Sequence, residues 1–294
     1  MVCAVDCTLG TDGSVPMALD YFKAMGGENV RDPTRLVFAL DHYVPATSPQ
    51  TIELHRIMRD FAKRFGITLH EAGEGIGHQL IVETGRALPG GLVVGADSHA
   101  VTYGALNCFA TGIGSSDLAA IMLCGRIWLR VPDSIRVVLT GQLPSGVYAK
   151  DVALALAGLL GADGAAYQAL EFTGSGITTL ALEDRLVLSN LAVEMGAKNG
   201  IFPADEETIA YLKSRTGQAF EPAKLSNRSH RIRMRVTARP WRSRSTHSRR
   251  SSHCRIWWIR WWRSRMRPAR RYRWFISVPA LAEDYATSIR PSQC

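Results

Sequence analysis

The sequence of 294 residues has few cysteines, and they show neither a Cys-x-x-Cys spacing nor the dense pattern of a disulfide-stapled domain. The first twenty residues have neither the basic start nor the apolar stretch of a secretory signal peptide. No run approaches the roughly 18 apolar residues of a membrane span. These absences predict a reducing, cytoplasmic setting and no membrane partner. The cysteines are Cys3, Cys7, Cys108, Cys124, Cys254 and Cys294.

Carboxylates are also missing from one long stretch, residues 223–282, which contains no Asp or Glu. Residues 1–222 hold 16 Lys and Arg against 24 Asp and Glu, a net charge of −8, whereas residues 223–294 hold 19 against 2, a net charge of +17. The second region also holds six of the seven tryptophans. We therefore predict a folded portion over 1–222 and a disordered, basic tail over 223–294.

Two interpretations of this tail remain open. Its arginines and indoles, densest at 256–263, could bind phosphate backbones or an anionic membrane surface, which would make the protein a binding module. The alternative is a reading-frame error, since a GC-rich gene read out of frame yields such a mixture of Arg, Trp, Ser and Pro. Residues 241–273 show neither helical nor strand periodicity, and the carboxylate-free stretch begins where the regular pattern of the preceding residues stops. We therefore favour the frame error and do not expect nucleic acid as a partner.

Strand-like apolar runs alternate with amphipathic segments through residues 1–222, a pattern typical of a layered α/β fold. The predicted strands lie at 36–40, 92–94, 135–139 and 169–172. The predicted helices lie at 16–25, 49–65, 117–123, 151–160, 183–195 and 205–215.

Two of these strands are followed closely by a carboxylate with a histidine beside it. Asp41-His42 follows the strand at 36–40, and Asp97-Ser98-His99 follows the strand at 92–94. In an open α/β sheet, ligands bind in the crevice beyond the carboxyl ends of the strands. Histidines and carboxylates placed there can be tuned to exchange protons near neutral pH, so the pattern indicates proton-transfer chemistry.

Three further residues are candidates for the same crevice. His78 lies between the two pairs in the sequence. Asn190 and Glu194, at i and i+4 of the predicted helix 183–195, would share one helix face. Each candidate has a plainer interpretation, as a turn-capping acid, a hydrogen-bonded core histidine or a polar helix face. His55 and His70 lie among charged residues, and we expect both at the surface.

Five motifs occur in a fixed order and spacing, and together they resemble the large subunit of 3-isopropylmalate dehydratase, in the aconitase superfamily. The branch that they resemble most includes the large subunits of homoaconitase and dimethylmalate dehydratase. The resemblance covers about residues 5–221 and implies a three-layer α/β/α fold. The motifs are Asp41-His42-x-Val-Pro, Gly-x-Gly-x-His78-Gln, Gly95-Ala96-Asp97-Ser98-His99, Gly112-Ile-Gly114-Ser-Ser-Asp117 and Asn190-x-x-x-Glu194-x-Gly-Ala-Lys-Asn-Gly200.

The resemblance implies a hydro-lyase that moves a hydroxyl between adjacent carbons of a small 2-hydroxy di- or tricarboxylate through an alkene. In the family, a [4Fe-4S] cluster binds the substrate's hydroxyl and carboxylate as a Lewis acid. Asp41 and His42 match the pair that helps the hydroxyl leave. A separate small subunit, the implied partner, supplies the base. The remaining matches are His78, Asp97 and His99, which bind the hydroxyl or water, and Ser98, Asn190 and Glu194, which line the cluster and substrate.

The sequence departs from the family at two points that bear on function. Thr102 stands where aconitases carry Asn, so the resemblance does not extend to that contact. The segment with a Thr-Ser-Cys motif and a Cys-x-x-Cys, which supplies the cluster's three thiolates in the family, is absent. We therefore expect a truncated chain with no metal ligands of the family type, no bound cluster and no dehydratase activity alone. The family's substrate is 2- or 3-isopropylmalate in leucine biosynthesis; homocitrate and dimethylmalate remain alternatives.

Overall fold

The computed structural model describes residues 1–217 and the backbone of one strand at 275–278. The predicted boundary after residue 222 lies outside the described residues, as does the basic tail apart from the backbone of 275–278, so neither interpretation of the tail is tested. At 275–278 the prediction of disorder is wrong, because this backbone forms a strand that pairs with the strand at 133–139. In the part that is described, no helix combines the length and the apolar character needed to cross a membrane.

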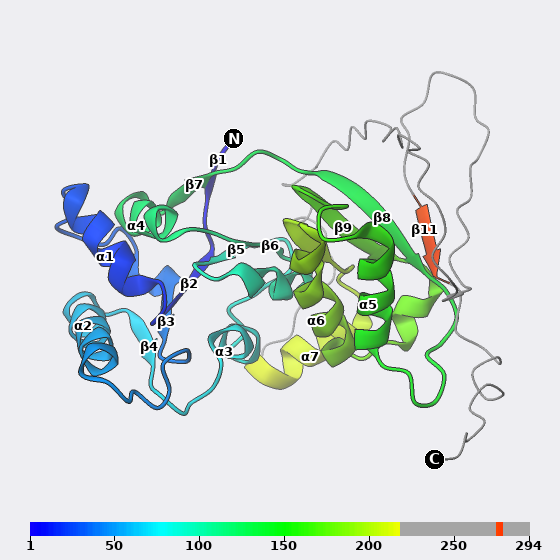
Figure 1. Cartoon of the computed structure of the whole chain (residues 1–294), viewed down its shortest axis with the longest axis horizontal. Helices are drawn as coiled ribbons and strands as arrows, with labels where there is room; N and C mark the ends of the chain where they lie inside the picture. The colour runs from blue at the N-terminus through cyan, green and yellow to red at the C-terminus, as the bar shows by residue number, and fades with distance from the viewer. Residues whose placement is uncertain (218–274, 279–294) are drawn as a thin grey trace, which may run out of the picture.

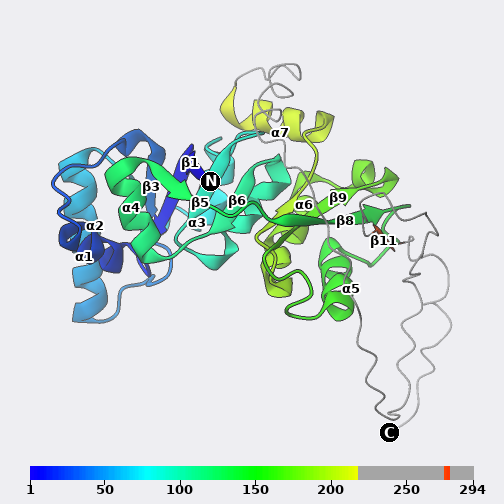
Figure 2. The ribbon, with the colours of Figure 1, turned by 90° about the horizontal axis from the view of Figure 1, so that it is seen from above.

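The first sheet has five parallel strands in the spatial order β4-β3-β2-β5-β6 (Figures 1 and 2). The chain moves outward in one direction from β2 through β3 to β4 and then restarts on the other side of β2 with β5 and β6. The boundary between β2 and β5 is thus the topological switch point, where open α/β sheets bind ligands. The strands are β2 (Cys7–Thr11), β3 (Leu36–Ala39), β4 (Thr68–His70), β5 (Leu92–Gly95) and β6 (Phe109–Gly112).

Helices cover both faces of this sheet, which confirms the predicted three-layer α/β/α fold. Successive strand residues point to opposite layers: Leu36 and Phe38 pack with one layer, and Val37 and Ala39 with the other. The first layer consists of α1 (Val15–Ala24), α2 (Pro49–Phe65) and α4 (Ser115–Cys124). The second consists of α3 (Gly77–Glu83), the 3₁₀ helix η2 (Ser98–Leu106), α6 (Leu182–Asn190) and α7 (Glu206–Thr216).

A second parallel sheet, in the order β10-β9-β8-β11, has its own apolar core, formed with α5 and the end of α6. It lies on the right of Figure 1, with the first sheet on the left. Its elements are β8 (Asp133–Leu139), α5 (Ala149–Leu160), β9 (Gln168–Thr173), β10 (Asn199–Ile201) and β11 (Phe275–Val278). The remaining elements are β1 (Val2–Ala4), which pairs antiparallel with β7 (Arg126–Trp128), and the 3₁₀ helices η1 (Pro33–Arg35), η3 (Ser175–Thr179) and η4 (Leu191–Met195).

Local sequence explains where α2 begins and ends. The Ser48 hydroxyl accepts the N–H of Thr51 in a capping box, and Gly66 ends the helix at φ 71°. The predicted helix 183–195 is wrong as a continuous element. The α-helix stops at Asn190 and continues as the tighter turn η4, which Gly196 ends at φ 80°.

The two halves meet at η2, where the backbones come too close for a side chain. Phe202 donates its N–H to the carbonyl of Gly104 at 3.0 Å. A Cβ at Gly104 would lie 2.0 Å from the carbonyl oxygen of Gly200. Glycine at 104 therefore lets β10 pack directly on η2, the segment that also carries the predicted site residues Ser98 and His99.

Candidate active site

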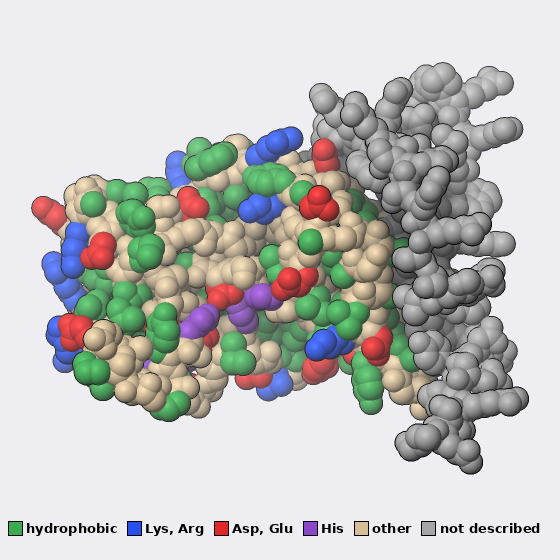
Figure 3. All heavy atoms as spheres, in the orientation of Figure 1, with side chains coloured by type: hydrophobic (Ala, Val, Ile, Leu, Met, Phe, Trp, Pro, Cys, Tyr) green, Lys and Arg blue, Asp and Glu red, His purple; other side chains and the backbone are tan. Residues whose placement is uncertain are grey.

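Side chains at the carboxyl ends of three neighbouring strands converge at the switch point. Asp12 follows β2, Asp41 and His42 follow β3, and Asp97 follows β5. In the space-filling view, histidine side chains gather beside acidic ones on one face of the molecule (Figure 3). The sheet thus brings His42 and Asp97 together, although they are 55 residues apart in the sequence.

The His42 imidazole is held by a carboxylate at each ring nitrogen. Nδ1 lies 2.7 Å from Asp41, and Nε2 lies 3.1 Å from Asp97. A carboxylate only accepts hydrogen bonds, so this arrangement favours the doubly protonated ring. Burial is the largest influence and would lower the pKa of His42, but the hydrogen bond to Asp41 and the charges of Asp41, Asp97 and Asp12 outweigh it and raise the pKa.

Asp97 links two histidines and a backbone N–H. Its Oδ1 accepts from Nε2 of His78 at 2.9 Å and from the N–H of His99 at 2.9 Å, and its Oδ2 faces His42. The hydrogen bond from His78 is the largest influence on the pKa of Asp97, which stays well below its usual range although burial opposes the shift. Asp97 is therefore ionised at neutral pH and accepts hydrogen bonds from the ring N–H groups of His42 and His78.

The geometry around His78 selects its tautomer. Nε2 must carry a proton to donate to the ionised Asp97, and Nδ1 lies 2.9 Å from the phenol of Tyr103. Burial raises the pKa of Tyr103 well above its ordinary value, so the phenol keeps its proton and can donate to Nδ1. Tyr103 is completely buried, so its hydroxyl holds Nδ1 of His78 from a fixed position in the core.

Asp41 is oriented by the first turn of α3. Its Oδ2 accepts the N–H of Gly77 at 2.6 Å, which leaves Oδ1 for the ring of His42. A Cβ at Gly77 would lie 3.0 Å from the same Oδ2 and 3.1 Å from the Cβ of Ala39. Glycine at 77 therefore permits the close approach that aims Asp41 at His42.

The rest of the predicted residues extend the site along η2 and η4. His99 lies with Nε2 3.3 Å from Glu194 and Nδ1 3.2 Å from the hydroxyl of Ser98. Asn190 donates to the hydroxyl of Thr102 at 2.9 Å, and Thr102 donates in turn to the backbone carbonyl of His99 at 2.6 Å. Glu194 thus joins the cluster directly, whereas Asn190 reaches it through Thr102.

Sequence reasoning missed two residues of the site and misplaced a third. Asp12 and Tyr103 were not expected in the site, and His55 was expected at the surface. That expectation for His55 is wrong: it is 3% exposed, and its Nε2 lies 2.9 Å from Asp12. The spacing of His55 with Met58 and Ala62, the other buried residues of α2, placed it on the apolar face and could have revealed this. The side chain of His70 is 16% exposed and lies 2.7 Å from Glu74.

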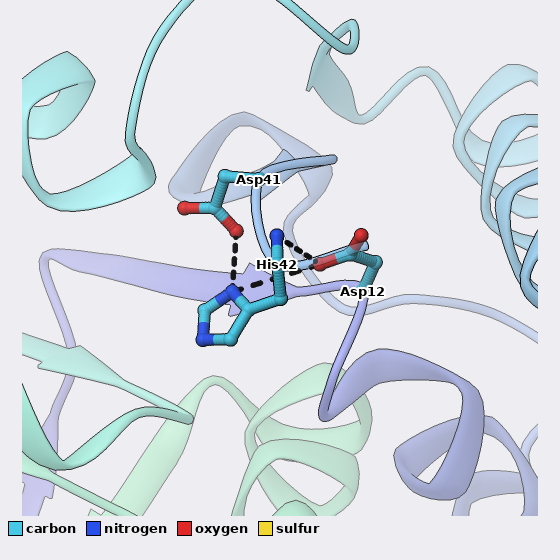
Figure 4. Close-up of side chains that lie close together, drawn as sticks. All are labelled: Asp12, Asp41 and His42. Atoms are coloured by element: carbon cyan, nitrogen blue, oxygen red, sulfur yellow. Dashed lines mark hydrogen bonds and ion pairs between the residues drawn. The ribbon is translucent and has the colours of Figure 1, made fainter. Parts of the chain in front are cut away.

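Ligand atoms of Asp12, Asp41 and His42 lie within 4.8 Å of one another, close enough for a metal ion (Figure 4). Hydrogen bonds already engage these atoms, however. Asp12 accepts from the N–H groups of His42 and Tyr43 and from His55, and Asp41 accepts from Gly77 and the ring of His42. We therefore assign the three residues to a hydrogen-bonded acid–base network rather than to a metal centre.

The thiols of the described residues do not fit an iron–sulfur cluster at this site. Cys7 begins β2 and Cys108 precedes β6, at the edge of the sheet opposite the histidines. Burial raises the pKa of Cys7 to about 12 and also raises the pKa of Cys108, so neither is a ready thiolate. Cys3 lies in β1, and Cys124 ends α4 just before β7, both at that same opposite edge. Cys254 and Cys294 lie outside the described residues.

The sequence matches known proteins over most of its length. It is 46% identical over 223 residues to the 3-isopropylmalate dehydratase large subunit 1 of Methanopyrus kandleri, covering 76% of this chain and 53% of the relative. It is 49% identical over 218 residues to the 3-isopropylmalate dehydratase large subunit of Syntrophus aciditrophicus, which covers 74% of this chain and 52% of the relative. It is 45% identical over 223 residues to the probable methanogen homoaconitase large subunit of Methanosarcina mazei, which covers 76% of this chain and 57% of the relative.

The chain therefore spans about half the length of the curated relatives that it matches. The model of the aconitase family (aconitate hydratase) matches residues 1–240, which include every site residue described above. With the three-layer fold and the cluster of acids and histidines at its switch point, this match shows that the chain belongs to the aconitase family.

Proposed function

We propose that residues 1–217 form the acid–base portion of a hydro-lyase that interconverts 2-isopropylmalate and 3-isopropylmalate. The observation that carries this proposal is the imidazole of His42, held between Asp41 and Asp97 and partly open to solvent, with 43% of its side chain exposed. A protonated ring in such a position can donate to a hydroxyl, which is a poor leaving group without a proton. The similarity to dehydratase large subunits supports the choice of substrate.

His42 would donate from Nε2. This atom's contact with Asp97, at 3.1 Å, is longer than the 2.7 Å contact of Nδ1 with Asp41, so a substrate hydroxyl can replace it more readily. Asp41 keeps its hold on Nδ1 and stabilises the ring in the donating orientation. In the hydration direction, Nε2 takes the proton back from the attacking water.

Asp97, His78 and His99 would bind the departing hydroxyl or the incoming water. Asp97 is fixed by His78, which Tyr103 holds from behind, so its carboxylate keeps one position. His99 is oriented between Ser98 and Glu194 and offers a second polar contact on the same side. These side chains thus position an oxygen nucleophile without large rearrangement.

The reaction also needs groups that we assign to no described residue. The family's [4Fe-4S] cluster has no fitting thiolates among residues 1–217, so no step is assigned to it in this chain. We infer that a small-subunit partner supplies the base for the carbon-bound proton and the substrate selectivity, as the large-subunit names of the relatives suggest. Alone, the chain is expected to have no turnover, and the cysteine pattern favours a cytoplasmic setting.

A chimera tests the proposal. Residues 1–217 replace the matching segment of the Syntrophus aciditrophicus large subunit, which is assayed with its small subunit for 3-isopropylmalate formed from 2-isopropylmalate. We expect turnover, and a loss of about 100-fold or more in His42→Gln, because general acid catalysis contributes about 10² to 10⁴. His70→Gln is the control, since His70 also pairs with a carboxylate but lies outside the network. Equal turnover of the His42 and His70 variants would refute the role of His42.

Homoaconitase activity is a second candidate, because the identity to the probable methanogen homoaconitase large subunit is almost the same, at 45%. The acid–base network acts on the carbon bearing the hydroxyl and would serve either substrate. To separate the two candidate activities, a second preparation combines the chimera with the Methanosarcina mazei small subunit and is supplied with homocitrate. Conversion of homocitrate by this second preparation, with no conversion of 2-isopropylmalate by the preparation that contains the Syntrophus aciditrophicus small subunit, would favour the homoaconitase assignment.

A further inference from the structure

A second pair of an acid and a histidine lies directly behind His42. The Asp12 side chain has no exposed surface, and the His55 side chain is 4% exposed, with Nε2 2.9 Å from Oδ2 of Asp12. The same carboxylate accepts the N–H of His42 through Oδ1 at 2.9 Å and the N–H of Tyr43 through Oδ2 at 2.9 Å. Asp12 therefore joins the end of β2, the turn after β3 and the middle of α2.

Burial of the Asp12 carboxylate costs much free energy unless its oxygens are fully hydrogen-bonded. Burial is the largest influence and would raise the pKa of Asp12, but the N–H groups of Tyr43 and His42 and the ring of His55 outweigh it and lower the pKa. Asp12 is therefore ionised at neutral pH. Because an ionised carboxylate can only accept, Nε2 of His55 must carry the proton in this contact.

The position of Asp12 affects both the backbone and the ring of His42. Its two backbone hydrogen bonds fix the turn from which the His42 side chain projects. Its Oδ1 also lies 3.6 Å from Nδ1 of His42, too far for a good hydrogen bond but close enough for a strong charge interaction. Figure 4 shows the carboxylates of Asp41 and Asp12 both directed toward this side of the ring.

We propose that Asp12 and His55 form a positioning pair for His42. Asp12 holds the His42 backbone and places a buried negative charge behind its ring, and His55 supplies the donor from α2 that keeps this carboxylate in place. The pair does not touch substrate in this arrangement. Its importance for catalysis rests on the proposed function of His42, but its effect on His42 is measurable without turnover.

The charged groups of the pair and around it come from five elements or the turns beside them, namely β2, β3, β4, β5 and α2. His42 faces Asp41, Asp97 and Asp12. Asp12 faces His42 and His55, and the charge of His55 also reaches Glu71, after β4. A change in the titration of His42 must therefore be separated from changes in Asp41 and Asp97, which the variants below leave in place.

Histidine-selective NMR titration of the whole chain provides the test. The chain has eight histidines, so the His42 signal is identified by its loss in His42→Gln. We expect Asp12→Asn to lower the pKa of His42, because the charge behind the ring is removed. Asp6→Asn is the matched control: Asp6 also accepts a backbone N–H, that of Leu92 at 2.9 Å, but at the opposite edge of the sheet. The control should leave the pKa of His42 unchanged.

A pair of His55 variants tests the second half of the proposal and decides the matter if Asp12→Asn does not fold. His55→Gln retains an N–H donor for Asp12, whereas His55→Leu has none. We expect the amide protons of His42 and Tyr43 to exchange about tenfold faster or more in His55→Leu, the factor for losing a hydrogen bond to a charged group, and the pKa of His42 to fall. His55→Gln should restore both towards the values of the unaltered protein.

Two results would overturn the proposal. One is a pKa of His42 that is the same in Asp12→Asn, Asp6→Asn and the unaltered protein. The other is a pair of His55 variants that differ in thermal stability but share the same His42 titration and the same amide exchange, which would make the pair a purely structural contact. Neither result depends on turnover, so the chimera assay can succeed or fail independently.

Discussion

Replacing Asp97 with Asn should remove both the stability and the pH dependence that this carboxylate gives the site. Asp97 accepts from His78 and from the N–H of His99, both at 2.9 Å, and faces Nε2 of His42 at 3.1 Å. The side chain is 16% exposed, so solvent screens these contacts only in part. An asparagine oxygen can keep one or two of them but has no charge.

The expected loss of stability follows from these contacts. Hydrogen bonds to charged groups contribute about 1.5–3 kcal/mol each, and the contact with the exposed His42 contributes at the low end. The loss of charge and of one contact in Asp97→Asn therefore predicts about 2–4 kcal/mol. For a domain of this size, 1 kcal/mol corresponds to about 2–4 °C, so the thermal midpoint should fall by roughly 5–15 °C.

The difference in thermal midpoint between the unaltered protein and Asp97→Asn should depend on pH in both the acid and the alkaline range. The folded pKa of Asp97 lies below its unfolded value of about 3.9, so its contribution is present above about pH 5 and is lost as the pH falls. The folded pKa of His42 lies above its unfolded value of about 6.5, so its contribution is complete below about pH 6 and is lost as the pH rises through the folded pKa. The gap in midpoint should therefore be widest at about pH 5–6.

Circular dichroism melts of the unaltered protein and of Asp97→Asn across this range measure the gap. Asp32→Asn is the control, because Asp32 also accepts a backbone N–H and has a lowered pKa but lies at the surface, ahead of β3. A gap that stays constant from acid to alkaline pH, or one no larger than that of Asp32→Asn, would refute the reasoning.

Three further expectations follow from the same structure. Tyr103→Phe should lower the free energy of unfolding in urea by about 1–2 kcal/mol, because His78 loses its buried hydrogen-bond partner; an unchanged midpoint would contradict this. Gly104→Ala should lower the free energy of unfolding by about 3 kcal/mol, because its Cβ would meet the Gly200 carbonyl at 2.0 Å. The control Gly158→Ala, with open space around it in α5, should leave the free energy of unfolding unchanged or raise it slightly. Similar effects of the two substitutions would show that the halves do not pack as described. Incubation of the chain with iron and sulfide should give no protein-bound cluster, and a broad visible absorption that stays with the protein after gel filtration would show the contrary.

The sequence was sufficient to predict the layered fold and most of the network, because both depend on local patterns. Helix α2 has its cap at Ser48 and its stop at Gly66, so its predicted bounds are those observed. The short apolar runs before Asp41 and Asp97 are strands whose carboxyl ends share one edge, and that topology alone brings His42 to Asp97. His78 follows because α3 starts at the same edge.

The features that sequence reasoning missed depend on tertiary contacts. The central strand β2 is only five residues long and contains Gly and Thr, so its identity comes from its neighbours β3 and β5 rather than from its composition. Consequently Asp12, at its end, was not expected in the site. Tyr103 lies in a 3₁₀ helix without a regular apolar period, and only the fold turns its phenol toward His78.

The most direct test of the central claim, that two carboxylates hold His42 as a protonated acid at the switch point of the sheet, is the nitrogen-15 NMR spectrum of its ring in the unaltered chain. We expect both ring nitrogens to remain protonated at a pH where a free imidazole has lost one proton, and the signal to revert toward that of free histidine in Asp97→Asn. A His42 ring that titrates like free histidine in the unaltered protein, and identically in the variant, would contradict the account.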